Sequence, residues 1–207
     1  MPSKFRLRYI FKPIVRVLAK ALIKLNLSPN GATIIMLCFS ILSLISLVFL
    51  QNSLLFAIFV FLCGLTDGVD GAIARLTERS TAFGGFLDSF MDRFSEFFIF
   101  FALLIFCWES VLWKVIDMKL VICISFVASV MISYCRARAE LFYKGDFDIG
   151  LMARSERLFY IFITNILAFF YGFFMEFLFI YMWLVLGTFF FRFTKIYNQI
   201  SKQKENK

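Results

Sequence analysis

Four aspartates lie between positions 67 and 92 of a chain that is otherwise strongly apolar, and they are the residues best suited to chemistry. They are Asp67, Asp70, Asp88 and Asp92. Clusters of carboxylate oxygens favour hard divalent ions, Mg²⁺ or Mn²⁺ before Zn²⁺. The chain contains no histidine, so histidine bases and His-ligated metals are excluded. Carboxylates must therefore supply both the metal ligands and any general base.

The spacing of these aspartates places them on two helical faces. At about 100° per residue, residues three and four positions apart share a face. The first face holds Asp67, Asp70, Gly71 and Ala74, and the second holds Gly84, Asp88 and Asp92. The short basic hairpin between the two predicted helices makes them antiparallel neighbours. The two faces can then meet, and the four carboxylates are expected to converge.

Four uncompensated carboxylates would not be stable in a membrane protein. Each ionisable group near the bilayer core costs on the order of 3 kcal/mol, and mutual repulsion adds to this cost. Divalent ions bridged by a polyphosphate would compensate the charge, and Gly71 and Gly84 leave room for such a ligand. Arg75, Arg79 and Arg93 could supply part of the positive charge. A buried ion-pair network and an aspartate-lined ion path are the alternatives.

The composition indicates an integral membrane protein. The 207 residues are 61% hydrophobic, well above the roughly one-half of a soluble domain. Runs long enough to cross about 30 Å of hydrocarbon are found at 32–50, 54–76, 85–108, 119–139, 157–176 and 177–197. The predicted fold is therefore all-α and polytopic, with six transmembrane helices in a single domain, 1–207.

The basic residues predict the orientation in the membrane. Most of the 22 lysines and arginines lie before the first span, after the second, after the fourth or at the C-terminus. The positive-inside bias then places both termini and the loops 76–84 and 136–157 in the cytoplasm. The net charge of +8 is mostly this asymmetry. Nucleic acid is not an expected partner, because no pattern of aromatic and basic residues outside the spans suggests base stacking.

Residues 1–27 have the pattern of an amphipathic helix. Its apolar face would contain Phe5, Ile10, Ile14, Leu18, Leu22 and Leu25, and its basic face Lys12, Arg16, Lys20 and Lys24. A helix of this kind lies on a bilayer surface and binds anionic headgroups. The alternative is a simple topological anchor.

The pattern Asp67-x2-Asp70-Gly71-x2-Ala74-Arg75-x8-Gly84-x3-Asp88-x3-Asp92 resembles the signature of the CDP-alcohol phosphotransferase family, with no position substituted. The resemblance extends over the six spans and the preceding amphipathic segment. It implies that an acceptor hydroxyl attacks the lipid-side phosphorus of a CDP-linked lipid and that CMP leaves. It also implies a homodimer in a cell membrane, with the active site facing the cytoplasm.

The resemblance assigns roles to individual residues. Asp67, Asp70 and Asp88 would hold two Mg²⁺ or Mn²⁺ ions, with Asp92 as a further ligand and the general base. The CDP-lipid, either CDP-diacylglycerol or CDP-archaeol, would be bound by Asn30, Gly31, Ala32, Thr33, Asp70, Gly71, Ala74, Arg75, Thr81 and Gly84. The sequence does not distinguish ester from ether lipid.

Four arginines near the cytoplasmic loop between the fourth and fifth spans indicate a phosphorylated polyol as acceptor. They are Arg136, Arg138, Arg154 and Arg157, and guanidinium groups suit phosphate. The runs RARAE and ARSER are similar to the branch of phosphatidylinositol phosphate and archaetidylinositol phosphate synthases. Ala153 and Ser155 replace the first Glu and the Pro of the ERPER run found there.

Inositol 1-phosphate is therefore the predicted acceptor. Glycerol 3-phosphate, as in a phosphatidylglycerophosphate synthase, and serine or another alcohol are alternatives within the family. The alternatives outside enzymes are a lipid-binding membrane protein and a cation transporter. A transporter would be expected to carry polar residues through the full depth of several helices, whereas these spans are almost entirely apolar beyond one end.

Overall fold

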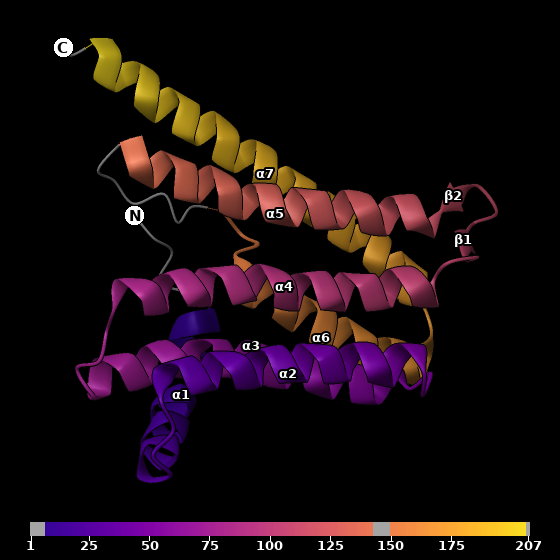
Figure 1. The fold of residues 1–207 in the computed structure, drawn as a ribbon. Coiled ribbons are helices and arrows are strands. Elements are labelled where there is room, and N and C mark those ends of the chain that lie inside the picture. Colours follow the sequence, from indigo (N-terminus) through magenta and orange to yellow (C-terminus); the bar gives the residue numbers. More distant parts are fainter. Residues whose placement is uncertain (1–6, 143–149, 206–207) are drawn as a thin grey trace.

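The computed structural model describes residues 7–142 and 150–205, which are helical apart from one small hairpin. The elements are α1 (Leu7–Lys24), α2 (Pro29–Val48), α3 (Ser53–Leu76), α4 (Ala82–Phe106), β1 (Val111–Leu112), β2 (Ile116–Asp117), α5 (Met118–Phe142), α6 (Arg154–Tyr171) and α7 (Phe174–Glu205). Helices α2 to α6 run lengthwise beside one another, α1 crosses them near one end, and the hairpin lies at the other end (Figure 1). The parts of the predicted domain at 1–6, 143–149 and 206–207 lie outside the described residues.

Helices α2 and α4 begin three residues before their predicted positions, and each has a side-chain cap. Ser28 Oγ accepts a hydrogen bond from Gly31 N at 3.1 Å, so α2 begins at Pro29. Thr81 Oγ1 accepts one from Gly84 N at 3.0 Å, so α4 begins at Ala82. Such caps contribute about 1 kcal/mol each. They place a helix N-terminus, with its free N–H groups, at the same end of the molecule as the aspartates.

Two turns differ from the prediction. The chain breaks between α6 and α7 at Gly172 and Phe173, whose φ angles are 79° and 62°, and the predicted boundary lay further along, after residue 176. Between α4 and α5, Val111 and Leu112 pair with Asp117 and Ile116 in an antiparallel hairpin. Strands this short carry no periodic signal, so the hairpin could not be expected from the pattern.

Helix α2 packs against both α3 and α4, whereas α3 and α4 contact each other little. Its packed face contains Ser40, Ser43 and Ser46, all buried, and each hydroxyl donates to the carbonyl three residues earlier. Small, internally satisfied side chains allow close helix approach. Helices α3 and α4 run antiparallel, as predicted, but they are joined mainly through α2 and have little direct contact with each other.

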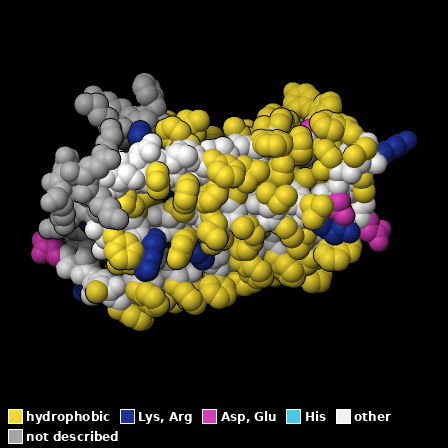
Figure 2. Space-filling view, turned by 90° about the horizontal axis from the view of Figure 1, so that it is seen from above, with side chains coloured by type: hydrophobic (Ala, Val, Ile, Leu, Met, Phe, Trp, Pro, Cys, Tyr) yellow, Lys and Arg dark blue, Asp and Glu magenta, His cyan; other side chains and the backbone are white. Residues whose placement is uncertain are grey.

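Four described helices, α2, α3, α5 and α7, are long and apolar enough to cross a membrane. Helices α4 and α6 are not among them, because charged residues lie along each: Asp92, Arg93 and Glu96 on α4, for example. On the face drawn in Figure 2, hydrophobic side chains cover most of the middle of the molecule, and the acidic side chains lie toward its two ends. This surface is typical of a protein surrounded by lipid.

Helix α1 packs on α3 through a small apolar cluster. Ala19 of α1 and Val69, Ala72 and Ile73 of α3 form its buried part. A Cβ added at Gly68 would lie 3.3 Å from Val15 Cγ2, which is closer than an ordinary van der Waals contact. Gly68 therefore sets how near α1 comes to α3.

We expect Gly68→Leu to displace α1, because the larger side chain would occupy the volume of Val15. Limited trypsin digestion of the purified protein should then cleave the basic α1 segment faster than in the unmodified protein. Gly187→Leu is the matched control, since a Cβ at Gly187 meets nothing within 4 Å. Equal cleavage of the Gly68 variant and the unmodified protein would contradict this packing role.

Candidate active site between helices α3, α4 and α6

Three of the four aspartates, one from α3 and two from α4, come together at the edge of a cavity. One carboxylate oxygen each from Asp67, Asp88 and Asp92 lies within 4.8 Å of the others. Asp88 Oδ1 is buried, and no described residue forms a hydrogen bond with it. An orphaned carboxylate oxygen beside two more carboxylates fits a hard divalent cation, which would satisfy all three.

Asp70 is not a member of that group of three. Its Oδ2 accepts a hydrogen bond from Thr33 Oγ1 at 2.9 Å, and its Oδ1 contacts the N–H of Gly71. Both Asp70 and Thr33 are buried. The hydrogen bond from Thr33 thus ties Asp70 to the first turn of α2. The Asp70 side chain also interacts with those of Asp88 and Asp67, so all four carboxylates lie near one another.

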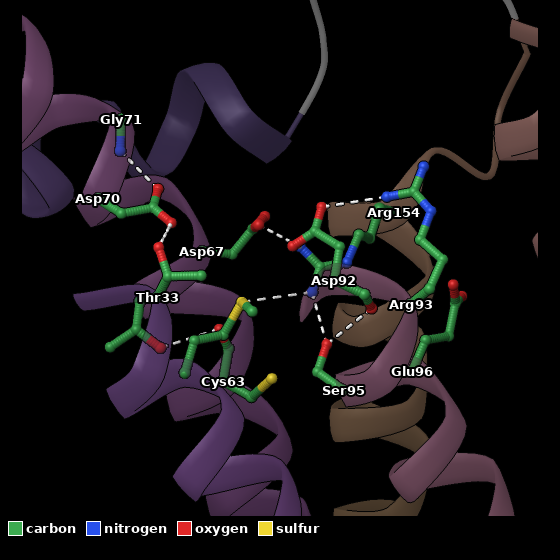
Figure 3. Close-up of polar contacts among 12 residues, drawn as sticks. Thr33, Cys63, Asp67, Asp70, Gly71, Asp92, Arg93, Ser95, Glu96 and Arg154 are labelled. Carbon is green, nitrogen blue, oxygen red and sulfur yellow. Dashed lines mark hydrogen bonds and ion pairs between the residues drawn. The ribbon is translucent and has the colours of Figure 1, made fainter. Parts of the chain in front are cut away.

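Arg154, at the start of α6, lies among these carboxylates. Its Nη1 forms ion pairs with Asp67 and Asp92, and its Nη2 donates to Ser95 Oγ at 2.8 Å (Figure 3). A positive group here offsets the repulsion among the aspartates. Of the four predicted acceptor arginines, this one therefore lies at the candidate metal ligands.

A cavity of about 720 Å³ opens beside the aspartates. Among the predicted site residues, those lining it are Asp67, Asp70, Gly71, Arg75, Asp88, Asp92, Arg136, Arg154 and Arg157. A volume of this size accommodates a small-molecule ligand. Its wall includes carboxylates from α3 and α4 and arginines from α5 and α6, so the cavity combines residues suited to metal ions and to anions.

The glycines near the cavity permit close contacts. A Cβ at Gly71 would lie 3.2 Å from Arg75 Nη1, so the guanidinium of Arg75 folds back over this position. A Cβ at Gly84 would lie 3.1 Å from Thr81 Oγ1 and 3.5 Å from Asn30 Oδ1. The beginnings of α2 and α4 therefore meet at Gly84, and Thr81 acts there as the cap of α4.

The remaining predicted residues lie outside the cavity wall. Gly31 is in the first turn of α2, Ala32 is buried against α1 and α3, and Ala74 is half-buried on α3. Arg138 is exposed on α5, with its guanidinium carbon 4.8 Å from the centre of the Phe142 ring.

Three polar residues beside the cavity were not singled out by the sequence reasoning. Ser95 and Glu96 extend the aspartate row on α4, but the family pattern, which ends at Asp92, does not include them. Arg192 lines the cavity from α7 and donates to the carbonyl of Ile132 at 2.9 Å. An arginine inside the predicted span 177–197 was itself a signal, because intramembrane charges are rare and mark functional sites.

Residues 26–191 match the family model described as CDP-alcohol phosphatidyltransferase. The chain belongs to this family of membrane enzymes. The match includes every aspartate of the site. As a member of this family, the protein is an integral membrane enzyme.

Two relatives of this chain are synthases of inositol phosphate lipids. The chain is 37% identical over 166 residues to an archaetidylinositol phosphate synthase of Pyrococcus horikoshii, covering 80% of this chain and 82% of that one. It is 31% identical over 151 residues to a phosphatidylinositol phosphate synthase of Mycobacteroides abscessus, covering 73% and 67%. These relatives carry the two synthase names that the RARAE and ARSER runs suggested.

Two solved structures have the same fold. The phosphatidylinositol phosphate synthase of Mycobacterium tuberculosis with CDP-DAG bound aligns with a TM-score of 0.74 and 26% identity, covering 89% of this chain and 94% of that one. The same enzyme in complex with manganese and citrate aligns with a TM-score of 0.76 and 25% identity, covering 88% of each chain. A divalent metal thus occurs in an enzyme of this fold.

We expect Asp88→Asn to lower the affinity for Mn²⁺ by at least roughly tenfold, because it replaces a charged ligand by a neutral amide. The measurement is titration of the purified protein with Mn²⁺, with free Mn²⁺ followed by electron paramagnetic resonance. Asp117→Asn is the control, since Asp117 lies in the hairpin and pairs with Lys119 at 3.4 Å. Unchanged affinity in the Asp88 variant would remove this residue from the metal site.

Proposed function

We propose that this enzyme transfers the phosphatidyl or archaetidyl group of a CDP-linked lipid to inositol 1-phosphate and releases CMP. The proposal rests on the observation that the aspartate cluster and several arginines line the same cavity. The names of the relatives, with inositol phosphate products attached to diacylglycerol or archaeol lipids, support the same acceptor.

In this proposal the aspartates hold two Mg²⁺ or Mn²⁺ ions, with Asp67, Asp88 and Asp92 as ligands and Asp70 completing the set. Bound metal ions would neutralise the charge of the diphosphate and of the departing CMP. Asp92 accepts the proton of the acceptor hydroxyl. A bond then forms between the acceptor oxygen and the lipid-side phosphorus, and the bond from this phosphorus to the CMP oxygen breaks.

The CDP end of the donor lies along α3 and the N-termini of α2 and α4. Arg75, folded over Gly71, is placed to meet a phosphate. The free N–H groups at the starts of α2 and α4, near Asn30 and Thr81, suit anionic or polar parts of the nucleotide. Gly31, Ala32, Thr33, Ala74 and Gly84 contribute close backbone approach and packing at this end.

The acceptor phosphate binds on the arginine side of the cavity. Arg136 and Arg154 line it together with Arg192 from α7, and a planar guanidinium can donate two parallel hydrogen bonds to a phosphate. Arg138 lies outside the cavity wall, so we assign it a supporting role at the surface of α5. Arg157 is buried against Glu96 and is not assigned to the acceptor phosphate.

The proposed membrane arrangement is based on the apolar runs and on the distribution of basic residues along the chain. We infer that α2 to α7 all cross the bilayer, with the charges of α4 and α6 sheltered in the cavity, and that the site and both termini face the cytoplasm. A homodimer is also expected from the family.

Helix α1 is inferred to lie on the cytoplasmic surface. Its exposed apolar residues are Ile10, Ile14 and Val17, and Leu25 directly after the helix is exposed too. Its basic residues Lys12, Arg16, Lys20 and Lys24 are exposed as well. Leu18 and Leu22, predicted to share the lipid-facing side, instead pack against the cluster with α3. The lipid-facing strip is therefore narrower than the sequence predicted, and the basic residues remain available to anionic headgroups.

The test of the proposal is CMP release by the detergent-solubilised enzyme with CDP-diacylglycerol or CDP-archaeol and Mg²⁺ or Mn²⁺. We expect inositol 1-phosphate to support turnover far better than glycerol 3-phosphate, serine or free inositol, and Asp92→Asn to abolish it while CDP-lipid still binds. Preference for glycerol 3-phosphate would preserve the reaction and refute the acceptor. No CMP with any acceptor would refute the reaction itself.

A second measurement distinguishes the contributions of Arg136 and Arg138 to acceptor binding. Arg136→Ala should raise the KM for the acceptor about tenfold, the equivalent of one lost charge-assisted hydrogen bond, with little change for CDP-lipid. Arg138→Ala is the matched control on the same helix, because Arg138 does not line the cavity, and its two KM values should remain near those of the unmodified enzyme. Equal effects of the two substitutions would undercut the acceptor pocket.

A further inference from the structure

A buried ion pair joins α6 to α4 below the aspartate cluster. Arg157 donates from Nε to Glu96 Oε1 at 2.9 Å, and its Nη2 lies 2.8 Å from the same oxygen. The residues are 1% and 2% exposed, respectively. Arg157 is thus held within the protein although the sequence suggested it for the acceptor phosphate, since reaching the acceptor would require breaking a buried pair.

Arg157 also fixes the chain that leads into α6. Its Nη1 donates to the carbonyl of Met152 at 3.1 Å. Ala153, at the cap position of α6, makes no side-chain cap hydrogen bond. Gly150 has φ +113°, and an added Cβ there would be only 2.8 Å from Thr188 Cγ2 of α7. The start of α6 is therefore held by Arg157 and by the close approach of Gly150 to α7.

The contacts of Arg157 with Glu96 and Met152 also bear on the position of Arg154. Arg154 precedes Arg157 by one helical turn, so the two side chains lie on the same side of α6. On α4, Glu96 follows Asp92 by one turn. The Glu96–Arg157 pair and the Arg154–Asp92 pair are consequently successive contacts between the same two helices.

We propose that Glu96 and Arg157 are positioning residues that hold Arg154 against Asp67, Asp92 and Ser95. The inference rests on the proposed function where it concerns the acceptor. The competing explanation is that the pair serves folding alone. The two explanations differ, because a buried ion pair can often be replaced by apolar residues without loss of stability, whereas its geometric role would be lost.

The experiment compares the unmodified full-length protein with Glu96→Leu/Arg157→Met in detergent. Each sample is treated with phenylglyoxal, which modifies accessible arginines, and the rate of modification at Arg154 is measured by peptide mass spectrometry. Exposed Arg138 in the same chain serves as internal standard. We expect a Tm near that of the unmodified protein and modification of Arg154 that is severalfold faster. Asn165→Leu, a buried polar-to-apolar change on the same helix, should leave the Arg154 rate unchanged.

An unchanged Arg154 rate in a folded double variant would overturn the inference. If the double variant does not fold, Arg157→Lys decides: lysine keeps a charge beside Glu96 but lacks the planar fork that reaches both Glu96 and the Met152 carbonyl. Faster modification of Arg154 in this variant supports the positioning role, and an unchanged rate contradicts it.

Kinetics add a readout that loss of folding alone would not produce. With whichever phosphorylated acceptor the unmodified enzyme uses, the double variant should raise the acceptor KM more than the CDP-lipid KM. Equal changes in both would count against positioning. If the unmodified enzyme releases no CMP with any acceptor, the proposed function fails, and the labelling rates still decide the role of the pair.

Discussion

The rest of the structure depends on the repulsion among carboxylates that the fold brings together inside an apolar protein. Asp67, Asp88 and Asp92 lie close enough to share one cation, and such a group is tolerated only with positive charge beside it. Arg154 supplies part of that charge from α6. A second carboxylate–arginine pair, Glu96 with Arg157, joins α6 to α4 one helical turn further along both helices.

The packing of α2 against α3 and α4 shapes the region that contains the cavity. Helix α2 packs on both α3 and α4, which contact each other little, and the cavity lies beside the aspartates of these two helices. Thr33 of α2 then reaches Asp70, so the bridging helix also shapes the polar wall.

The cavity wall combines two kinds of side chain that suit the chemistry of the family. Carboxylates of α3 and α4 can hold divalent ions, and arginines from α5, α6 and α7 line the same cavity and can hold an anion. A reaction between a diphosphate-linked lipid and a phosphorylated acceptor needs both, because each substrate carries negative charge that must be offset before the two can approach.

The sequence by itself determined the helical membrane class, the family and the aspartate motif, because apolar run length and i, i+4 spacing are local properties. It also singled out Arg136, Arg154 and Arg157, which line the cavity, but not Arg192, which lines it as well. Only the tertiary structure decided that α2 separates α3 from α4, that Asp70 pairs with Thr33, and that Arg157 is buried against Glu96 while Arg154 meets the aspartates. These outcomes depend on contacts between residues far apart in the chain. Helical periodicity specifies the face on which a residue lies, but not the helix against which that face packs.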